Sequence, residues 1–290
     1  MMKKNKIIVA AILLCCFPAA QAEDARSVME KVFDRDDGDS SYSHEVIATC
    51  KYRFQDKKVR CVEKPRVKRF EAVRKDYGEE GDDQKSVMII HKPAIESGIG
   101  FLQYDWDDQA RDSDQWMYLS ALGKVKRIVS GNDDEPKKGS LFGSEFSYED
   151  IEKRHVDDYV YKLLREEVYK GNDSWVIESL PTPEHARKSN YGRSVQWIDK
   201  SRYLIHKIDL FDRGGKRVKQ LVFSNYQLHD DVWLAQKLNM NNLRDRRIST
   251  MKTEEVTVNI EVDDALLTQR TLTDGAFREK HLNTLRKRAK

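Results

Sequence analysis

Two cysteines outside the N-terminal 22 residues have a spacing that suits a covalent cross-link. Cys50 and Cys61 flank a segment that turns at residues 55–58, which would place them on neighbouring strands of a hairpin. In an oxidising compartment we expect such a pair to form a structural disulfide rather than to stay as free thiols. A metal site would need further ligands nearby, and His44 alone is a poor candidate. Closing so short a loop contributes on the order of 3 kcal/mol.

The other side chains that commonly do chemistry form no recognisable catalytic or metal-binding pattern. The seven histidines are scattered, and no two have the spacing of metal ligands on a helix. There is no nucleophile elbow, phosphate-binding glycine loop or dinucleotide fingerprint. Acidic residues are so frequent that no catalytic pair stands out. We therefore predict a protein that is not an enzyme and that needs no metal or cofactor.

Apolar and aromatic side chains are the remaining candidates for a binding role. All five tryptophans lie after residue 100, on or beside predicted strands. They either fill the core or line a hollow that accepts hydrocarbon. Burial of an acyl chain gains about 0.8 kcal/mol per methylene without any polar motif. An apolar cleft of this kind therefore leaves only a weak signal in a sequence.

Segments of strand length dominate the chain and must position these side chains. The clearest covers residues 256–262, where valine or isoleucine occupies every second position, and residues 232–240 show a similar alternation. Charged residues make up 35% of the chain and hydrophobic residues 39%, so the core is thin relative to the surface. A curved antiparallel sheet with one buried face suits this composition, because polar residues can occupy every second strand position.

Helical patterns are few and short. Apolar spacing predicts a helix over about 23–34. Ser147 and Asp150 fit a capping box that would open a short helix, with the Ser147 side chain accepting a hydrogen bond from the backbone. Residues 274–290 would form either a terminal helix or a disordered end. We expect the basic residues within 280–290 to be a solvated tail.

The N-terminus has the pattern of a secretory signal. Three lysines precede a short apolar run, and a small-x-small site ends at Ala22. Cys15 and Cys16 raise the alternative of a lipid anchor, but Leu14 stands where lipoprotein processing needs a small residue. We predict cleavage after Ala22, a periplasmic location and a single mainly β domain over 23–290.

Removing this signal changes the charge balance. The full chain has 52 Lys+Arg and 49 Asp+Glu, and the first 22 residues hold three lysines and no acid. The predicted mature chain is therefore balanced, and its composition gives no support for nucleic-acid binding. No other hydrophobic stretch approaches the length of a membrane span.

Two linked motifs cover residues 116–151. Residues 116–128 read Trp-Met-Tyr-Leu-Ser-Ala-Leu-Gly-Lys-Val-Lys-Arg-Ile, and residues 139–151 read Gly-Ser-Leu-Phe-Gly-Ser-Glu-Phe-Ser-Tyr-Glu-Asp-Ile. This stretch resembles the LolA-like outer-membrane lipoprotein-sorting protein family, although Ser120 stands where the family often has proline. The resemblance continues more loosely through residues 192–242 and is weak before residue 64.

The resemblance implies a fold and a function. The fold is a strongly curved antiparallel sheet, a half-open barrel, with a few short helices on its concave side. The function is that of a periplasmic carrier or chaperone that binds lipid or lipoprotein acyl chains in a hydrophobic cleft. The branch with this motif is often paired with inner-membrane exporters of the resistance-nodulation-division type. An alternative is an accessory interaction subunit of such an exporter, with no lipid cargo. By strand parity, the candidate cleft residues are Leu102, Tyr104, Trp106, Met117, Leu119, Trp197, Leu234 and Leu238.

Overall fold

The structure is a computed structural model that describes residues 24–56, 58–78, 82–130 and 135–289. The predicted signal, its cleavage site at Ala22 and the cysteines Cys15 and Cys16 lie outside the described residues. No helix in the described ranges is long and apolar enough to cross a membrane.

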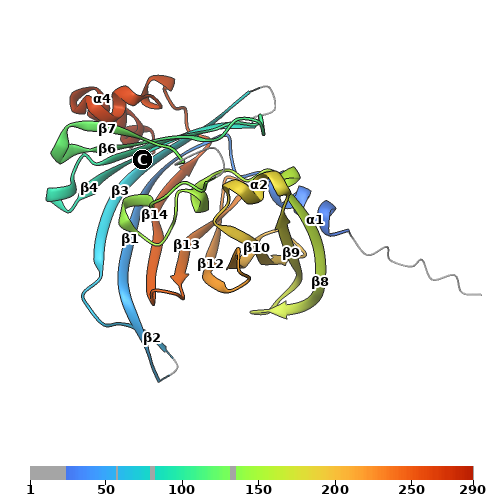
Figure 1. Ribbon diagram of the computed structural model, residues 1–290. Coiled ribbons are helices and arrows are strands. Elements are labelled where there is room, and N and C mark those ends of the chain that lie inside the picture. Colours follow the sequence, from blue (N-terminus) through green and yellow to red (C-terminus); the bar gives the residue numbers. More distant parts are fainter. Residues whose placement is uncertain (1–23, 57, 79–81, 131–134, 290) are drawn as a thin grey trace, which may run out of the picture.

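One antiparallel sheet of 14 strands organises the described residues (Figure 1). Its strand order is β7-β6-β5-β4-β3-β1-β14-β13-β12-β11-β10-β9-β8, and β2 pairs with β1 alone. The strands are β1 (Ser40–Gln55), β2 (Lys58–Cys61), β3 (Arg66–Tyr77), β4 (Asp83–Lys92), β5 (Gly100–Asp105), β6 (Asp114–Leu119), β7 (Lys124–Ile128), β8 (Tyr159–Tyr169), β9 (Asn172–Pro181), β10 (Tyr191–Asp199), β11 (Ile205–Asp212), β12 (Arg217–His229), β13 (Val232–Asn242) and β14 (Arg247–Val258).

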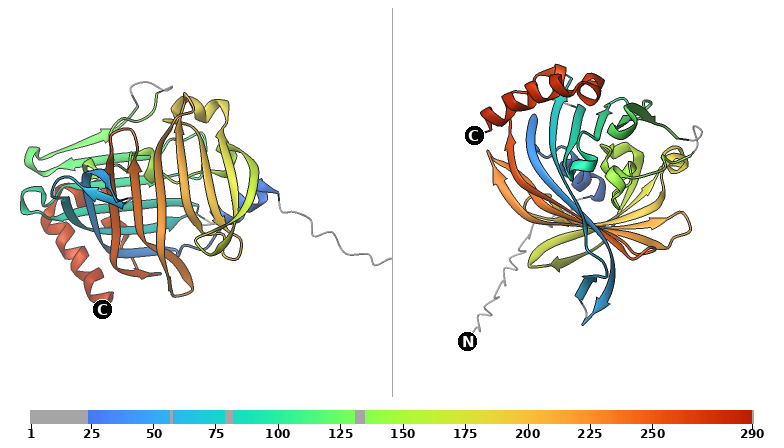
Figure 2. Two further views of the ribbon diagram at one scale, coloured as in Figure 1. Left: turned by 90° about the horizontal axis from the view of Figure 1, so that it is seen from below. Right: turned by 90° about the vertical axis from the view of Figure 1, so that its left-hand side faces the viewer.

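The sheet curves strongly but does not close into a barrel. Its edge strands, β7 and β8, are consecutive in the chain yet do not pair with each other. Residues 135–158, here called the crossing segment, connect toward β8 across the concave side, which we call the inner face (Figure 2). The expected half-open, mainly β architecture is therefore confirmed.

Short helices cover parts of both faces. Helix α1 (Ala25–Phe33) packs on the inner face, where Val28 and Met29 contact Trp175 and Ile177 of β9. Helices α3 (Gln269–Thr273) and α4 (Gly275–Arg288) lie on the outer face of β3–β7 (Figure 2). One half of the sheet is therefore buried on both sides.

The C-terminal basic residues belong to a helix, which is one of the two structures expected for residues 274–290. Residues 280–288 belong to α4, whose Leu282 and Leu285 are fully buried against the outer face of the sheet. Asp274 begins the helix by accepting a hydrogen bond from the backbone N–H of Phe277 at 2.9 Å. Lys280, Lys287 and Arg288 lie on the exposed side of this helix, whereas Arg286 faces the sheet and pairs with Glu71.

Two further local expectations need correction. The strand expected to run through residue 262 ends at Val258, because Asn259 adopts a left-handed backbone conformation with φ of 53°. The capping box at Ser147 opens only a 3-10 turn, Glu149–Ile151. There the Ser147 hydroxyl donates to Asp150 at 2.7 Å instead of accepting from the backbone. Helix α2 (Pro183–Lys188), capped by Thr182, was not predicted.

Candidate functional site

The crossing segment fills much of the inner face of the sheet. Its Phe142 meets Phe70 of β3 edge to face, with ring centres 5.5 Å apart. Its Tyr148 stacks on Phe101 of β5 at 5.8 Å. Leu141 and Phe146 are fully buried in the same cluster. The second sequence motif thus supplies an apolar plug for the sheet that the first motif helps to form.

Polar contacts hold this plug at several points, among them Glu145 and Asp150. Glu145 donates its backbone N–H to Ser249 of β14 at 2.9 Å, and its carboxylate binds Arg247 at 2.5 Å. Asp150 accepts a hydrogen bond from Lys219 of β12 at 2.7 Å and another from Tyr191 of β10, also at 2.7 Å. The carboxylates of Glu145 and Asp150 are buried at these anchors, with side-chain exposures of 9% and 3%, so moving the plug requires breaking buried, charge-assisted hydrogen bonds.

A cavity of about 200 Å³ lies between the crossing segment and strands β10–β12. Its floor is apolar and comes from alternate positions of neighbouring strands, which therefore share the inner face. The floor residues are Ile205, Ile208, Leu210, Leu221 and Phe223.

The rim of this cavity is polar and borders a second, larger hollow of about 640 Å³. The two hollows share the residues Glu149, Glu152, Lys153, Asp158 and His185. An apolar floor under a polar rim is suited to an amphiphile, because hydrocarbon and head group then meet surfaces of matching polarity. The arrangement offers binding by burial and no evident covalent chemistry.

Burial controls the charges on the rim. It raises the pKa of Glu152 to about 7, although Lys137 lies 2.7 Å from the carboxylate and opposes the shift. Burial also lowers the pKa of His185, whose Nε2 lies 2.8 Å from the Tyr159 hydroxyl. Among the described residues Arg154 has no carboxylate partner, and its guanidinium lies over the Tyr159 ring at 4.5 Å.

The structure divides the predicted cleft residues between the two faces. Met117 and Leu119 of β6 and Leu238 of β13 belong to the inner-face cluster with the plug. Leu102 and Tyr104 of β5 instead lie on the outer face beneath α3 and α4, where the Tyr104 hydroxyl donates to the Leu267 carbonyl at 2.7 Å.

The remaining predicted residues also lie away from the cavity. Trp197 packs with Val176 and Val195 on the outer face of β9 and β10. Trp106 follows β5 and hydrogen-bonds Asp114 at 3.2 Å. Leu234 is half-buried on β13. None of the eight predicted residues is among the described residues that line the 200 Å³ cavity.

The floor residues lie on two neighbouring strands with different sequence patterns. Ile208 and Leu210 alternate with Lys207 and Asp209 in β11, whereas Leu221 and Phe223 in β12 have the uncharged neighbours Gln220, Val222 and Ser224. None of the described residues lining the cavity is a tryptophan.

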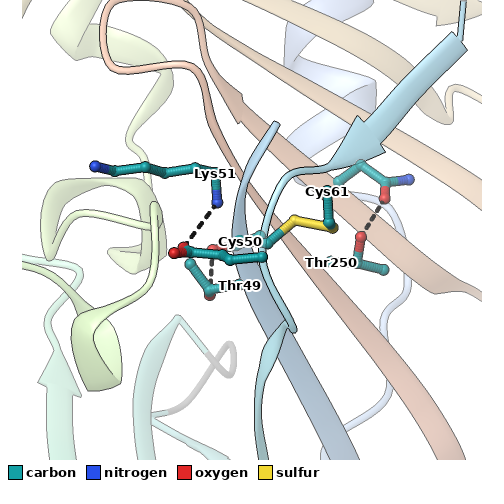
Figure 3. Close-up of a disulfide and its surroundings, with 8 residues drawn as sticks. Thr49, Cys50, Lys51, Cys61 and Thr250 are labelled. Atoms are coloured by element: carbon teal, nitrogen blue, oxygen red, sulfur yellow. Dashed lines mark hydrogen bonds between the residues drawn. A yellow bond between two sulfur atoms is a disulfide. The ribbon is translucent and has the colours of Figure 1, made fainter. Parts of the chain in front are cut away.

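The predicted disulfide is present between Cys50 and Cys61 (Figure 3). It links β1 to the end of β2, with Cα atoms 5.8 Å apart, at the base of a hairpin in which Gln55 pairs with Lys58. Beside it, Thr49 and Ser249 join their hydroxyls at 2.7 Å across β1 and β14. Within the described ranges no cluster of three or more His, Cys, Asp and Glu side chains is arranged to hold a metal ion.

An open, strongly curved antiparallel sheet, plugged on its concave side by the connection between its two edges, is the LolA-like fold. A family model described as an uncharacterized protein matches residues 82–274, and the chain belongs to this family. No curated protein matches the sequence.

Solved structures agree with this assignment. A DUF1329 family protein from Desulfovibrio piger is 25% identical, covers 86% of this chain and 97% of its own, and has a TM-score of 0.75. A putative outer membrane lipoprotein-sorting protein domain from Vibrio parahaemolyticus is 26% identical, with coverages of 86% and 98% and a TM-score of 0.74. A LolA superfamily protein from Nitrosomonas europaea, 19% identical, shares the fold with a TM-score of 0.61 over 85% of this chain and 98% of its own.

Proposed function

We propose that this protein is a periplasmic carrier or chaperone that binds the acyl chains of a lipid or lipoprotein, without covalent chemistry. The observation that carries the proposal is the apolar cavity between β10–β12 and the crossing segment. The similarity to a putative lipoprotein-sorting domain supports the same cargo class. Each methylene that enters the cavity gains about 0.8 kcal/mol, so a chain of modest length binds without a specific polar motif.

Cargo entry requires the crossing segment to move. The cavity of about 200 Å³ is smaller than the roughly 300–1,000 Å³ of most small-molecule sites. Displacing Phe142 and Phe146 from the inner face would extend the hollow along β1, β3 and β5, whose apolar side chains those rings now cover. Cargo would then replace the plug on the sheet, so that apolar surface stays covered in both states.

Lipid binding by the purified protein tests this function. Native mass spectrometry of protein isolated from the periplasm should find bound lipid, and a fluorescent fatty acid should bind the delipidated protein. Leu221→Trp, which fills the cavity, should weaken fatty-acid binding at least tenfold. Leu102→Met, a volume-conserving change on the outer face, is the matched control and should leave binding unchanged.

Two results would count against the carrier. One is that the purified protein carries no lipid and binds neither the fatty acid nor lipidated peptides. The other is unchanged binding in Leu221→Trp when urea unfolding shows that the variant is folded.

The partner and the location are part of the same proposal. We infer export to the periplasm from the signal pattern that ends at Ala22. N-terminal sequencing of the periplasmic protein should begin at Glu23. An exporter of the resistance-nodulation-division type is the proposed membrane partner. The accessory-subunit alternative would be favoured by two results together. The protein would bind no lipid, and the Leu221→Trp variant would still co-purify with such an exporter.

A further inference from the structure

The hairpin formed by the end of β1 and by β2 projects from the body of the molecule (Figure 1). Apart from the buried Tyr52, whose ring meets that of Phe54 at 5.5 Å, its side chains gain little protection from the rest of the chain. Every described residue from Arg53 to Val67 is exposed. The hairpin therefore contributes little to the core, and its composition needs another explanation.

Apolar side chains are concentrated on this exposed element. Four of the twelve large apolar side chains that are exposed in the described residues fall within residues 54–67. They are Phe54 at 66% exposure, Val62 at 53%, Val67 at 46% and Val59 at 42%. Phe54 and Val59 are cross-strand partners, so their side chains lie on the same face of the hairpin. A gathering of apolar groups at a projecting tip is typical of an interaction site.

The same element is strongly basic in a chain whose predicted mature part has no net charge. Between Cys50 and Phe70, six exposed cations make no ion pair and no side-chain hydrogen bond to any described residue: Lys51, Arg53, Lys58, Arg60, Lys64 and Arg66. The next two cations, Lys68 and Arg69, are paired with Glu96 and Glu254. Only Asp56 and Glu63 offset this charge within the stretch.

We propose that this hairpin docks the protein on the surface of an anionic phospholipid membrane. Phe54 and Val59 would enter the boundary between head groups and acyl chains, while the cations of the same hairpin, including the Arg53–Arg60 pair on its other face, contact lipid phosphates. The Cys50–Cys61 disulfide ties the two strands at the base of the hairpin, so little ordering is needed on binding. This inference stands apart from the cargo proposal, because it uses neither the cavity nor the crossing segment.

Vesicle flotation with the purified full chain tests the proposal. The probe is a vesicle of phosphatidylethanolamine with about 30% phosphatidylglycerol, compared with a vesicle of phosphatidylcholine alone. The protein should float with the anionic vesicles only, and binding should fall as NaCl rises from about 50 to 300 mM, because salt screens the attraction.

Two hairpin variants separate the two contributions. Arg53→Glu/Arg60→Glu should weaken partitioning about 25-fold or more, since each basic side chain near an anionic surface contributes roughly fivefold. Phe54→Ser should weaken it about tenfold through the loss of apolar burial. The matched controls lie elsewhere on the surface: Lys124→Glu/Lys126→Glu on β7, and Val168→Ser on β8, where Val168 is 67% exposed. Both controls should bind as the parent does.

Three outcomes would overturn the proposal. They are failure of the parent protein to bind anionic vesicles, binding that survives both hairpin variants, and equal losses in the hairpin variants and the controls. Urea unfolding of each variant verifies its fold, and fatty-acid binding should be unchanged in the hairpin variants. A protein that binds fatty acid but not vesicles would leave the carrier function intact and reject the docking role.

Discussion

Arg286 of α4 forms a two-point ion pair with Glu71 of β3, with Nε 2.7 Å from Oε1 and Nη2 2.5 Å from Oε2. The Glu71 side chain is only 2% exposed; it also accepts a hydrogen bond from Tyr42 and lies within ion-pair distance of His91 Nε2. Burial alone would raise the pKa of Glu71, but its contacts with His91, Arg286 and Tyr42 outweigh burial and hold that pKa well below its usual range. The C-terminal helix is thereby tied to the outer face of the sheet.

Removing Arg286 should destabilise the protein strongly. Arg286→Ala leaves the buried Glu71 carboxylate without its main partner, and such a change costs about 3–5 kcal/mol. Urea unfolding at neutral pH measures the difference. Arg288→Ala is the control, because Arg288 pairs with the exposed Glu261 at 2.9 Å and an exposed pair contributes about 1 kcal/mol or less. Similar losses in the two variants would contradict a special role for the Glu71 pair.

Glu45 on the inner face of β1 predicts a pH dependence of stability. Burial raises its pKa to about 7, more than the Ser43 and Thr253 hydroxyls lower it, and its Oε2 is buried without a hydrogen-bond partner among the described residues. The folded protein therefore holds a proton here that the unfolded chain releases near pH 4.5. Stability should fall as pH rises from about 4.5 to about 7 and should then level off.

Glu45→Gln isolates this effect. The amide cannot ionise, so the variant should be more stable than the parent by about 2 kcal/mol at pH 8 and nearly equal to it at pH 4. Urea unfolding across that range gives the comparison, with the exposed Glu255→Gln as control. A stability difference that does not change with pH would argue against the buried carboxyl as its source.

Gly100 of β5 should not tolerate a side chain, because α3 packs directly on it. A Cβ atom at this position would lie 2.7 Å from Leu272 Cδ2 and 2.8 Å from Ile89 Cδ1, both in the outer-face core. Gly100→Ala should therefore cost about 1–3 kcal/mol through overpacking. Thermal unfolding tests this against Gly214→Ala, where the nearest atom is 3.4 Å away at Asp212. If both variants are as stable as the parent, the packing of α3 on β5 leaves room for a methyl group at Gly100.

The disulfide should stabilise the fold by restricting the unfolded chain. Cys50→Ala/Cys61→Ala opens a loop with a sequence separation of 11 and should cost on the order of 3 kcal/mol. The same loss should follow reduction of the parent protein. A thiol reagent added to the unreduced protein in denaturant should label neither Cys50 nor Cys61. Labelled thiols at those positions, or a free energy of unfolding that does not change on reduction, would count against this role.

Segments of strand length predicted most of the strands, and several of them, such as residues 232–240, alternate apolar and polar residues. The spacing of Cys50 and Cys61 likewise predicted their bridge, since a hairpin brings its own ends together. The motifs of residues 116–151 predicted the LolA-like architecture through family resemblance. All of these are local features or patterns that a linear sequence carries.

Tertiary structure alone decided which face of the sheet is hollow. In β5 the adjacent residues Phe101 and Leu102 are both fully buried, Phe101 under the crossing segment and Leu102 under the C-terminal helices. Alternation cannot distinguish two faces when both are covered, so strand parity assigned Leu102 and Tyr104 to the wrong side. The cavity floor around Ile208 and Leu221 depends on where a distant segment crosses, and that placement follows from packing rather than from any local pattern.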